Sequence, residues 1–182
     1  MTPLVSNLWP QFMVDPAFAA CFGQVIVEHA QMLRQERQVI FTLRSGAPLD
    51  KNLCARLLAS LQPDYEGFEL RIQNLFGYAM LDEAALRDLM EEMKRDGVPI
   101  NGFLDRCKIN IIGQKITIGV CHGTKFLQEM HFEKLLAERI ASHTGVRTQV
   151  TLQRAVSEAD QHHTEEKRGR KTGQLLVNVE KK

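Results

Sequence analysis

Cys121 and His122 stand next to each other, and a cysteine with a histidine is the pair that catalytic thiol nucleophiles use. The pair follows the β-branched run from Ile116 to Val120, which predicts a strand. Neighbouring side chains of a strand point to opposite faces, so the thiol and the imidazole would not reach each other. The sequence therefore does not favour a nucleophilic role for this pair.

Metal binding is the second chemistry that these side chain types could carry. The candidate zinc ligands are Cys107, Cys121, His122 and His131. Ordinary zinc motifs hold paired ligands two to four residues apart, and these spacings do not match that pattern. His162 and His163 lie in a polar, charge-dense tail, where solvation is expected. We expect neither a metal nor another cofactor.

Anion binding is the third possibility, at Gly123, Thr124 and Lys125. These residues lie between a predicted strand and a predicted helix, where backbone N–H groups can bind a phosphate. The segment lacks the rest of the phosphate-binding loop pattern. The chain also has no carboxylate pair, GxGxxG or Ser-His-Asp set that suggests catalysis. A small enzyme with an anion site stays the weaker alternative, and the sequence favours no active site.

Four basic residues in the tail could contact a nucleic-acid backbone: Lys167, Arg168, Arg170 and Lys171. They follow Glu165 and Glu166, and a mixed charge run of this kind is typical of a solvated, disordered linker. Residues 1–155 carry 17 basic and 17 acidic side chains. A nucleic-acid binder usually carries a basic excess, so the neutral body favours other partners.

Aromatic residues gather near the N-terminus: Trp9, Phe12, Phe18 and Phe22. Asp15 and Pro16 predict a helix start there, with a capping carboxylate before a proline at the first helical position. One interpretation is a helix packed on the sheet that follows. The other is a partner-binding segment, because large aromatic side chains are enriched in interface cores.

The elements that must position these residues begin with two predicted antiparallel strands, 24–33 and 38–45. Asp50 can cap a helix over 50–61, whose leucines form one apolar stripe. A third strand is predicted over 68–72. Residues 24–75 are thus expected to form strand, strand, helix and strand.

The following residues predict a second small unit. Its expected elements are a helix from Asp82 to Arg95, a possible short helix over 102–107, a hairpin over 109–120, a helix from Gly123 to Gly145 and a strand over 146–152. Phe126, Met130, Leu135 and Ile140 are expected on the apolar face of the long helix, and Thr124 is a candidate N-cap.

We therefore expect an α+β fold of two small consecutive units, with helices packed on short, mostly antiparallel sheets. The expected domains are 1–75, with an N-terminal helical segment, and 76–155; residues 156–182 form the charged linker. The element order resembles a truncated K-homology (KH) fold, which binds nucleic-acid backbone through a GXXG loop. The candidate loop, 96–102, has its glycines at the wrong spacing, which favours a protein-interaction module.

The location expected from the sequence is the cytoplasm. No apolar run approaches the roughly 18 residues of a membrane helix, and the N-terminus does not resemble a secretion signal. Four cysteines without regular spacing, Cys21, Cys54, Cys107 and Cys121, are typical of reduced thiols in such a protein. The 44% hydrophobic and 25% charged composition predicts a well-formed core.

The order of segments over residues 18–153 resembles the N-terminal region of the PolC-type DNA polymerase III α subunit of Gram-positive bacteria. The matching segments are FGQVIVEHAQML, RQVIFTLRS, the helix over 50–61, GFELRI, IIGQKITIGV, the helix after Gly123 and VRTQVTL. The charged tail is placed like the linker before that family's OB-fold domain. The likeness is one of layout, without a diagnostic motif.

This resemblance implies a non-catalytic, protein-interaction region that takes part in DNA replication. In that family the region comprises two truncated KH-like domains similar to the C-terminal domain of the clamp-loader τ subunit, and its implied partners are replisome proteins, τ among them. The DNA-directed DNA polymerase (nucleotidyltransferase), 3′–5′ exonuclease and DNA contacts belong to later domains. A single-stranded nucleic-acid-binding KH-like module is the alternative.

Overall fold

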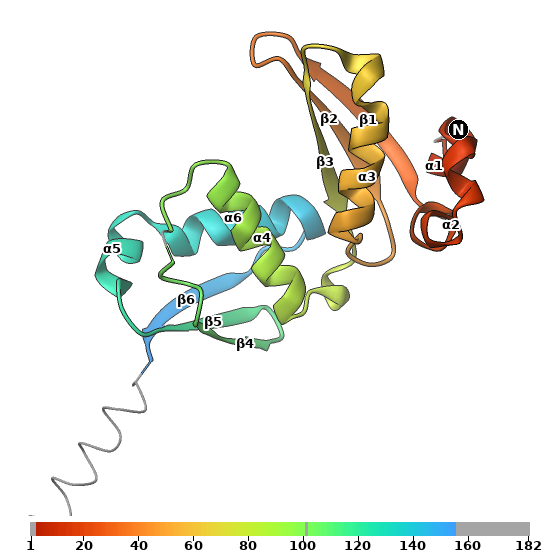
Figure 1. Ribbon diagram of the computed structural model, residues 1–182. Helices are drawn as coiled ribbons and strands as arrows, with labels where there is room; N and C mark the ends of the chain where they lie inside the picture. The colour runs from red at the N-terminus through yellow and green to blue at the C-terminus, as the bar shows by residue number, and fades with distance from the viewer. Residues whose placement is uncertain (1–2, 101, 156–182) are drawn as a thin grey trace, which may run out of the picture.

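The computed structural model describes residues 3–100 and 102–155, and these residues fold as two small α+β units (Figure 1). Each unit has its own three-stranded sheet, with strand orders β1-β2-β3 and β4-β5-β6. The α+β class and the two consecutive sheets predicted from the sequence are confirmed. The tail over 156–182, including its four basic residues, lies outside the described residues.

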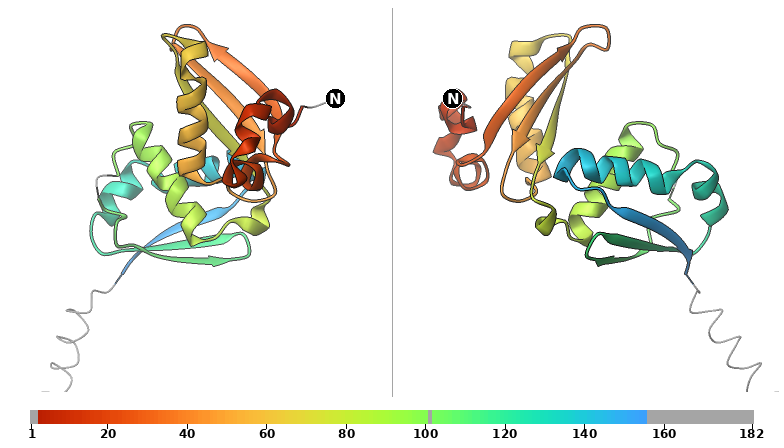
Figure 2. Two further views of the ribbon diagram at one scale, coloured as in Figure 1. Left: turned by 45° about the vertical axis from the view of Figure 1, so that its right-hand side comes forward. Right: turned by 180° about the vertical axis from the view of Figure 1, so that it is seen from behind.

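The N-terminal segment of the first unit is a series of short helices. It contains α1 (Val5–Leu8), a 3-10 helix (Pro10–Val14) and α2 (Pro16–Phe22). The Asp15 side chain accepts a hydrogen bond from the Ala17 N–H at 2.9 Å, so the predicted cap at the start of α2 is present. In Figure 2 these helices lie beside the N-terminal end of β1, away from the second unit.

The first sheet is built from β1 (Ile26–Leu33), β2 (Gln38–Arg44) and β3 (Glu69–Leu75). The connection between β2 and β3 contains α3 (Lys51–Leu61) and a 3-10 helix (Gln62–Tyr65), and α3 lies along one face of the sheet (Figure 1). Asp50 caps α3 by accepting the Leu53 N–H at 2.9 Å.

The second unit begins with a 3-10 helix (Tyr78–Met80) and α4 (Glu83–Arg95), which Asp82 caps. The later elements are β4 (Lys108–Ile112), β5 (Lys115–Val120), α5 (Thr124–Glu129), α6 (Phe132–Thr144) and β6 (Gln149–Arg154). Figure 1 shows α4 and α6 together over one face of the sheet. The other face of this sheet carries the polar side chains of its strands.

Both units repeat one arrangement, a helix, an antiparallel hairpin, a helical crossover and a third strand parallel to the central one. In the second unit the crossover holds two helices, which makes its order KH-like. In the first unit it holds one α-helix, so the fold is truncated. Each sheet pairs one antiparallel with one parallel neighbour. The sheets are therefore mixed, where the sequence predicted mostly antiparallel pairing.

Two further details differ from the sequence prediction. Residues 102–106 form turns rather than a short helix. The single helix expected over 123–145 is broken into α5 and α6, because His131 adopts a left-handed conformation with φ 55°. Gly123, also left-handed, is the residue before α5, and Thr124 is the first helical residue rather than its cap.

Each unit encloses its own hydrophobic core. The large, fully buried side chains of the first core include Phe22, Leu43 and Leu57, and those of the second include Leu86, Phe132, Leu136 and Ile140. The apolar stripe predicted for α4 is buried as expected, with Leu86, Leu89, Met90 and Met93 all in the second core. Between the two cores lie polar residues that bond one unit to the other.

Candidate functional site at the junction of the two units

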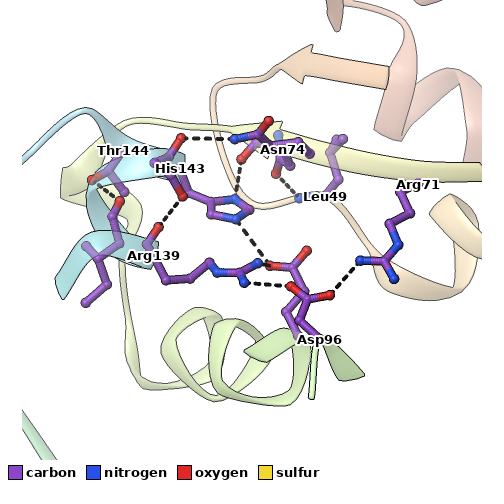
Figure 3. A network of polar contacts seen from close by, with 11 residues as sticks. Leu49, Arg71, Asn74, Asp96, Arg139, His143 and Thr144 are labelled. Carbon is purple, nitrogen blue, oxygen red and sulfur yellow. Dashed lines mark hydrogen bonds and ion pairs between the residues drawn. The ribbon is translucent and has the colours of Figure 1, made fainter. Parts of the chain in front are cut away.

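The junction is formed where β3 of the first unit meets α4 and α6 of the second (Figure 3). Asp96, just after α4, bonds one arginine from each unit. It accepts Arg71 Nη1 from β3 at 2.6 Å and Arg139 Nη2 from α6 at 2.6 Å. A carboxylate shared by two guanidinium groups forms charge-assisted hydrogen bonds, which are stronger than neutral ones. Asp96 is thus the polar centre of the contact.

The surroundings of Asp96 change its affinity for a proton. Burial alone would raise the pKa of Asp96, but the hydrogen bonds from Arg139 and Arg71 outweigh burial and hold that pKa below its ordinary value. A depressed pKa in the folded chain means that the unfolded chain binds the proton more readily. The stabilisation is therefore present above the ordinary aspartate pKa of about 3.9 and is lost as pH falls through the lower, folded-state value.

A pH series tests this link between Asp96 and stability. We expect Asp96→Asn to lower the urea midpoint at pH 7, and we expect the difference from wild type to shrink as the pH falls from 5 to 3. Asp64→Asn, which changes an exposed carboxylate of the first unit, is the matched control and should leave the midpoint unchanged. A gap between Asp96→Asn and wild type that is the same at every pH would contradict the assignment.

His143, near the end of α6, is the second bridge between the units. Its side chain is 5% exposed, and its ring Nδ1 lies 2.7 Å from the backbone oxygen of Asn74 on β3. The ring Nε2 lies 3.2 Å from Glu92 Oε2 on α4. The backbone oxygen of His143 also accepts the Phe76 N–H at 3.0 Å. The buried His143 thus contacts β3, the residue Phe76 that follows β3, and α4.

The side chain of Asn74 extends this network into the first unit (Figure 3). Its Oδ1 accepts the Leu49 N–H at 2.9 Å, and its Nδ2 donates to Ser45 Oγ at 2.7 Å. Asn74 therefore fastens the loop before α3 to β3, while its backbone holds His143. The contact with the second unit is directly connected to the geometry of the β2–α3 loop.

A cleft of about 750 Å³ lies beside this network, between α3 and β3 on one side and α4 on the other. Its lining combines apolar side chains with charged ones, among them Leu58, Leu70, Ile72, Arg71 and Glu91. Lys51 of α3 and Asp88 of α4 form an ion pair at 2.5 Å across it. Both side chains are about half exposed, so this pair adds little stability.

The polar side chains at the junction bond and position one another. Two of the junction's carboxylates, Glu92 and Asp96, are engaged by arginine and histidine side chains, and the lining holds one thiol, Cys54. Burial, followed by the nearby Cys21 and Asp50, raises the pKa of Cys54 to about 12, so the nucleophilic thiolate is not formed at neutral pH. Among residues 3–100 and 102–155, no cluster of three metal-ligating side chains occurs.

The four predicted partner-binding aromatics divide into two pairs. Phe18 and Phe22 are buried in the first core, where their rings stack with centroids 5.6 Å apart. They support the fold and are not available to a partner in the folded chain. Trp9 and Phe12 are half-buried and pack against the same core, with the Trp9 ring edge-on to Phe41 at 5.7 Å. Only Trp9 and Phe12 can contribute to a surface.

The other candidates from the sequence do not come together as a site. Cys121 and His122 are exposed, and their side chains form no hydrogen bond with each other. The His122 ring packs edge-on against Phe103 at 5.6 Å instead. Cys107 is buried, and its backbone oxygen accepts Arg87 Nη2 at 2.9 Å. The segment after Gly123 leads into a helix of only six residues.

Thiol labelling at pH 8 under native conditions separates the cysteines by environment. We expect Cys121 to react first because it is exposed. Cys54 should react more than about a hundredfold more slowly, because it is part-buried and its pKa of about 12 leaves little thiolate. Mass spectrometry after timed iodoacetamide treatment gives the order, with labelling in urea as the control. Equal labelling rates for Cys54 and Cys121 in the folded chain would show that Cys54 on α3 is accessible to the reagent, contrary to this prediction.

The residues that form the junction carried no local signal in the sequence. Asn74 and His143 are 69 positions apart, and Asp96 lies in a segment predicted only as a loop. Each is a polar residue at an ordinary element end, so no spacing pattern links them. Knowledge that β3 and α6 are neighbours was needed to find them.

Comparisons of this chain with protein-family models, with curated proteins and with solved structures found no match. In the part of the chain that the structure describes, no helix is long and apolar enough to cross a membrane.

Proposed function

We propose that this chain is a non-catalytic, protein-interaction region of a bacterial replicative DNA polymerase of the PolC type, acting in the cytoplasm in replisome assembly. The observation that supports this most is the combination of two KH-like units with a built polar junction, while the side chains that could do chemistry are dispersed. Two small units joined by polar contacts present surfaces that a partner protein can cover. The partners proposed from the resemblance are replisome proteins, with the clamp-loader τ subunit first among them.

The surface proposed for this contact is the N-terminal helical segment. Trp9 and Phe12 are partly exposed there, and Leu8 and Val14 beside them are exposed to 46% and 85%. Apolar side chains exposed on adjacent short helices can be covered by a partner, and Trp is the residue type most enriched in interface hot spots. We place the partner surface at these four side chains, here called the N-terminal patch.

A binding experiment with the full chain tests the proposal. The double variant Leu8→Asp/Val14→Asp charges the N-terminal patch at two exposed side chains. Ile112→Asp charges an apolar side chain of the second unit that is 67% exposed, between the values of Leu8 and Val14. We expect the first variant to lose binding to the C-terminal domain of the τ subunit in calorimetry and the second to retain it. Unchanged binding by Leu8→Asp/Val14→Asp, or no binding by wild type, would reject the proposed τ contact at this patch.

Single-stranded nucleic-acid binding is the second candidate function. Lys108 and Lys115 lie on the polar face of the second sheet, which α4 and α6 leave uncovered. Against it, the turn between α5 and α6 contains Met130 and His131 and no glycine pair of the GXXG kind. If the chain binds single-stranded DNA through these lysines, the affinity must fall steeply with salt. A flat salt response would reject this alternative.

A further inference from the structure

The outer edge of β3 has backbone groups without a strand partner. β3 is the last strand of the first sheet, and its Glu69 N–H and Leu75 carbonyl are bonded toward the β2 side. Alternate residues of a strand direct their N–H and C=O groups to opposite sides. The groups of Leu70, Ile72 and Asn74 therefore point away from β2, toward the cleft at the junction.

Part of this edge is already occupied by the second unit. The Asn74 carbonyl accepts a hydrogen bond from Nδ1 of the His143 ring. The next outward group along the edge, the Phe76 N–H, donates a hydrogen bond to the His143 carbonyl. At the other end, Gln62 Nε2 donates to the Phe68 carbonyl at 2.8 Å. Among the described residues, no hydrogen bond reaches the outward N–H or C=O of Leu70 or Ile72. The backbone groups of Leu70 and Ile72 thus remain available for pairing, between the bonded groups of Phe68 and Asn74.

The cleft beside this open stretch has two chemically different sides. Toward α3 the lining is mostly apolar, with Leu49, Leu58 and the side chains of Leu70 and Ile72, and it includes Lys51. Toward the opposite face of the sheet it is charged, and Arg71 lies there with its acidic partners. An extended strand that paired with β3 would place alternate side chains on these two sides. The cleft thus fits a strand with one apolar and one polar face.

Residues 174–180 of this chain, QLLVNVE, have that pattern. Leu175, Val177 and Val179 would form the apolar face, and Asn178 and Glu180 the polar face, on which Leu176 is the one apolar exception; β-branched residues favour strands. The acidic Glu180 would fall on the side where arginines lie. Nineteen residues lie between Ala155 and Leu175, a length that can span up to about 70 Å. A body of this size has a radius of gyration of only about 15 Å, so the segment reaches the cleft.

We propose that residues 174–180 bind in the cleft as a fourth strand on the edge of β3. Backbone bonds to Leu70 and Ile72 would hold the segment, and its apolar face would cover the side of the cleft that α3 lines. Because the segment belongs to the same chain, its effective concentration at the cleft is high. Occupation in cis also closes an open strand edge, which otherwise pairs with other chains.

Amide exchange by nuclear magnetic resonance on the full chain tests this inference at the two free amides. We expect the Leu70 and Ile72 amides to exchange at least about tenfold faster in Val177→Lys than in wild type. Asn178→Lys is the matched control, because it adds the same charge on the polar side of the segment, and it should retain the wild-type rates. Adding a peptide of residues 172–182 to Val177→Lys should restore slow exchange.

The result that overturns the proposal is also defined at these amides. Equal exchange of Leu70 and Ile72 in wild type and Val177→Lys would show that the segment does not occupy the edge. If the Leu70 and Ile72 amides exchanged faster in Asn178→Lys as well as in Val177→Lys, the prediction that the segment has one apolar and one polar face in the cleft would be wrong. Neither variant changes a residue of the N-terminal patch, so failure here leaves the proposed τ contact untouched.

Discussion

Replacing His143 with alanine is expected to lower the free energy of unfolding by about 2–4 kcal/mol and to separate the unfolding of the two units. The ring is buried and bonds the Asn74 carbonyl at 2.7 Å, and its other nitrogen lies 3.2 Å from Glu92. Alanine leaves the Asn74 carbonyl without its partner in a part-buried site, which costs about 1–3 kcal/mol, and removes the closer of the two contacts of Glu92 Oε2, which keeps Arg139 Nη1 at 3.7 Å. It also leaves a space at the contact between β3 and α6.

Two probes distinguish separate unfolding from simple loss of stability. Trp9 is the only tryptophan and belongs to the first unit, so its fluorescence reports that unit, whereas circular dichroism reports both. In wild type we expect the two urea curves to coincide, as in a two-state transition. In His143→Ala they should diverge. His122→Ala, at an exposed histidine, is the control and should leave them coincident.

Coincident curves with an unchanged midpoint in His143→Ala would contradict a structural role for the bridge. A lower midpoint with curves that still coincide would mean that His143 stabilises the chain while other contacts couple the units. The ion pairs of Asp96 with Arg71 and Arg139 are the contacts that would then carry the coupling. Combining His143→Ala with Asp96→Asn measures how far the two bridges depend on each other.

The fold could be predicted from the sequence where periodicity and capping agreed. Asp50 and Asp82 each precede an apolar stripe of helical spacing, and both cap helices in the structure. The alternation of Val39, Phe41 and Leu43 marked the central strand β2, and all three side chains are buried. These signals are local, so they need no knowledge of the partners in space.

The break between α5 and α6 could not be predicted, because apolar residues continue through it. The sequence placed Phe126 and Leu135 on the apolar face of one long helix, yet both are exposed, at 41% and 36%. The left-handed His131 changes the direction of the chain, so Leu127 and Phe132 are buried instead. A non-glycine residue rarely adopts this conformation, and no glycine or proline near His131 indicated a break in the helix.

The parallel pairing of β3 with β2 shows the same limit at the level of the sheet. Strand propensity identified both strands but contains no information on their direction. The crossover through α3 brings the chain back to the end of the sheet where β2 began, which makes the pair parallel. The mixed sheet follows, and with it the position of β3 as an edge that faces the second unit. The junction and the cleft both depend on that placement.

Replacing Gly123 with alanine is expected to lower the free energy of unfolding by about 2–4 kcal/mol, for two independent reasons. Gly123 has φ +79°, a conformation that costs any other residue about 1–2 kcal/mol. A Cβ at this position would also lie 2.3 Å from the Phe103 ring, with two more ring atoms within 2.8 Å. The ring would have to leave its contacts with His122 and Phe126.

Two companion variants separate the two costs in urea denaturation. Gly113→Ala also places alanine at a positive φ, +57°, but its Cβ would meet nothing within 4 Å, so it should show the conformational cost alone. Truncating the ring in Gly123→Ala/Phe103→Ala removes the clash, so the effect of Gly123→Ala should be smaller in the Phe103→Ala background than in wild type. Strict additivity of the two substitutions would show that the ring moves aside freely. In that case the close approach of Phe103 to the backbone would not be what requires glycine before α5.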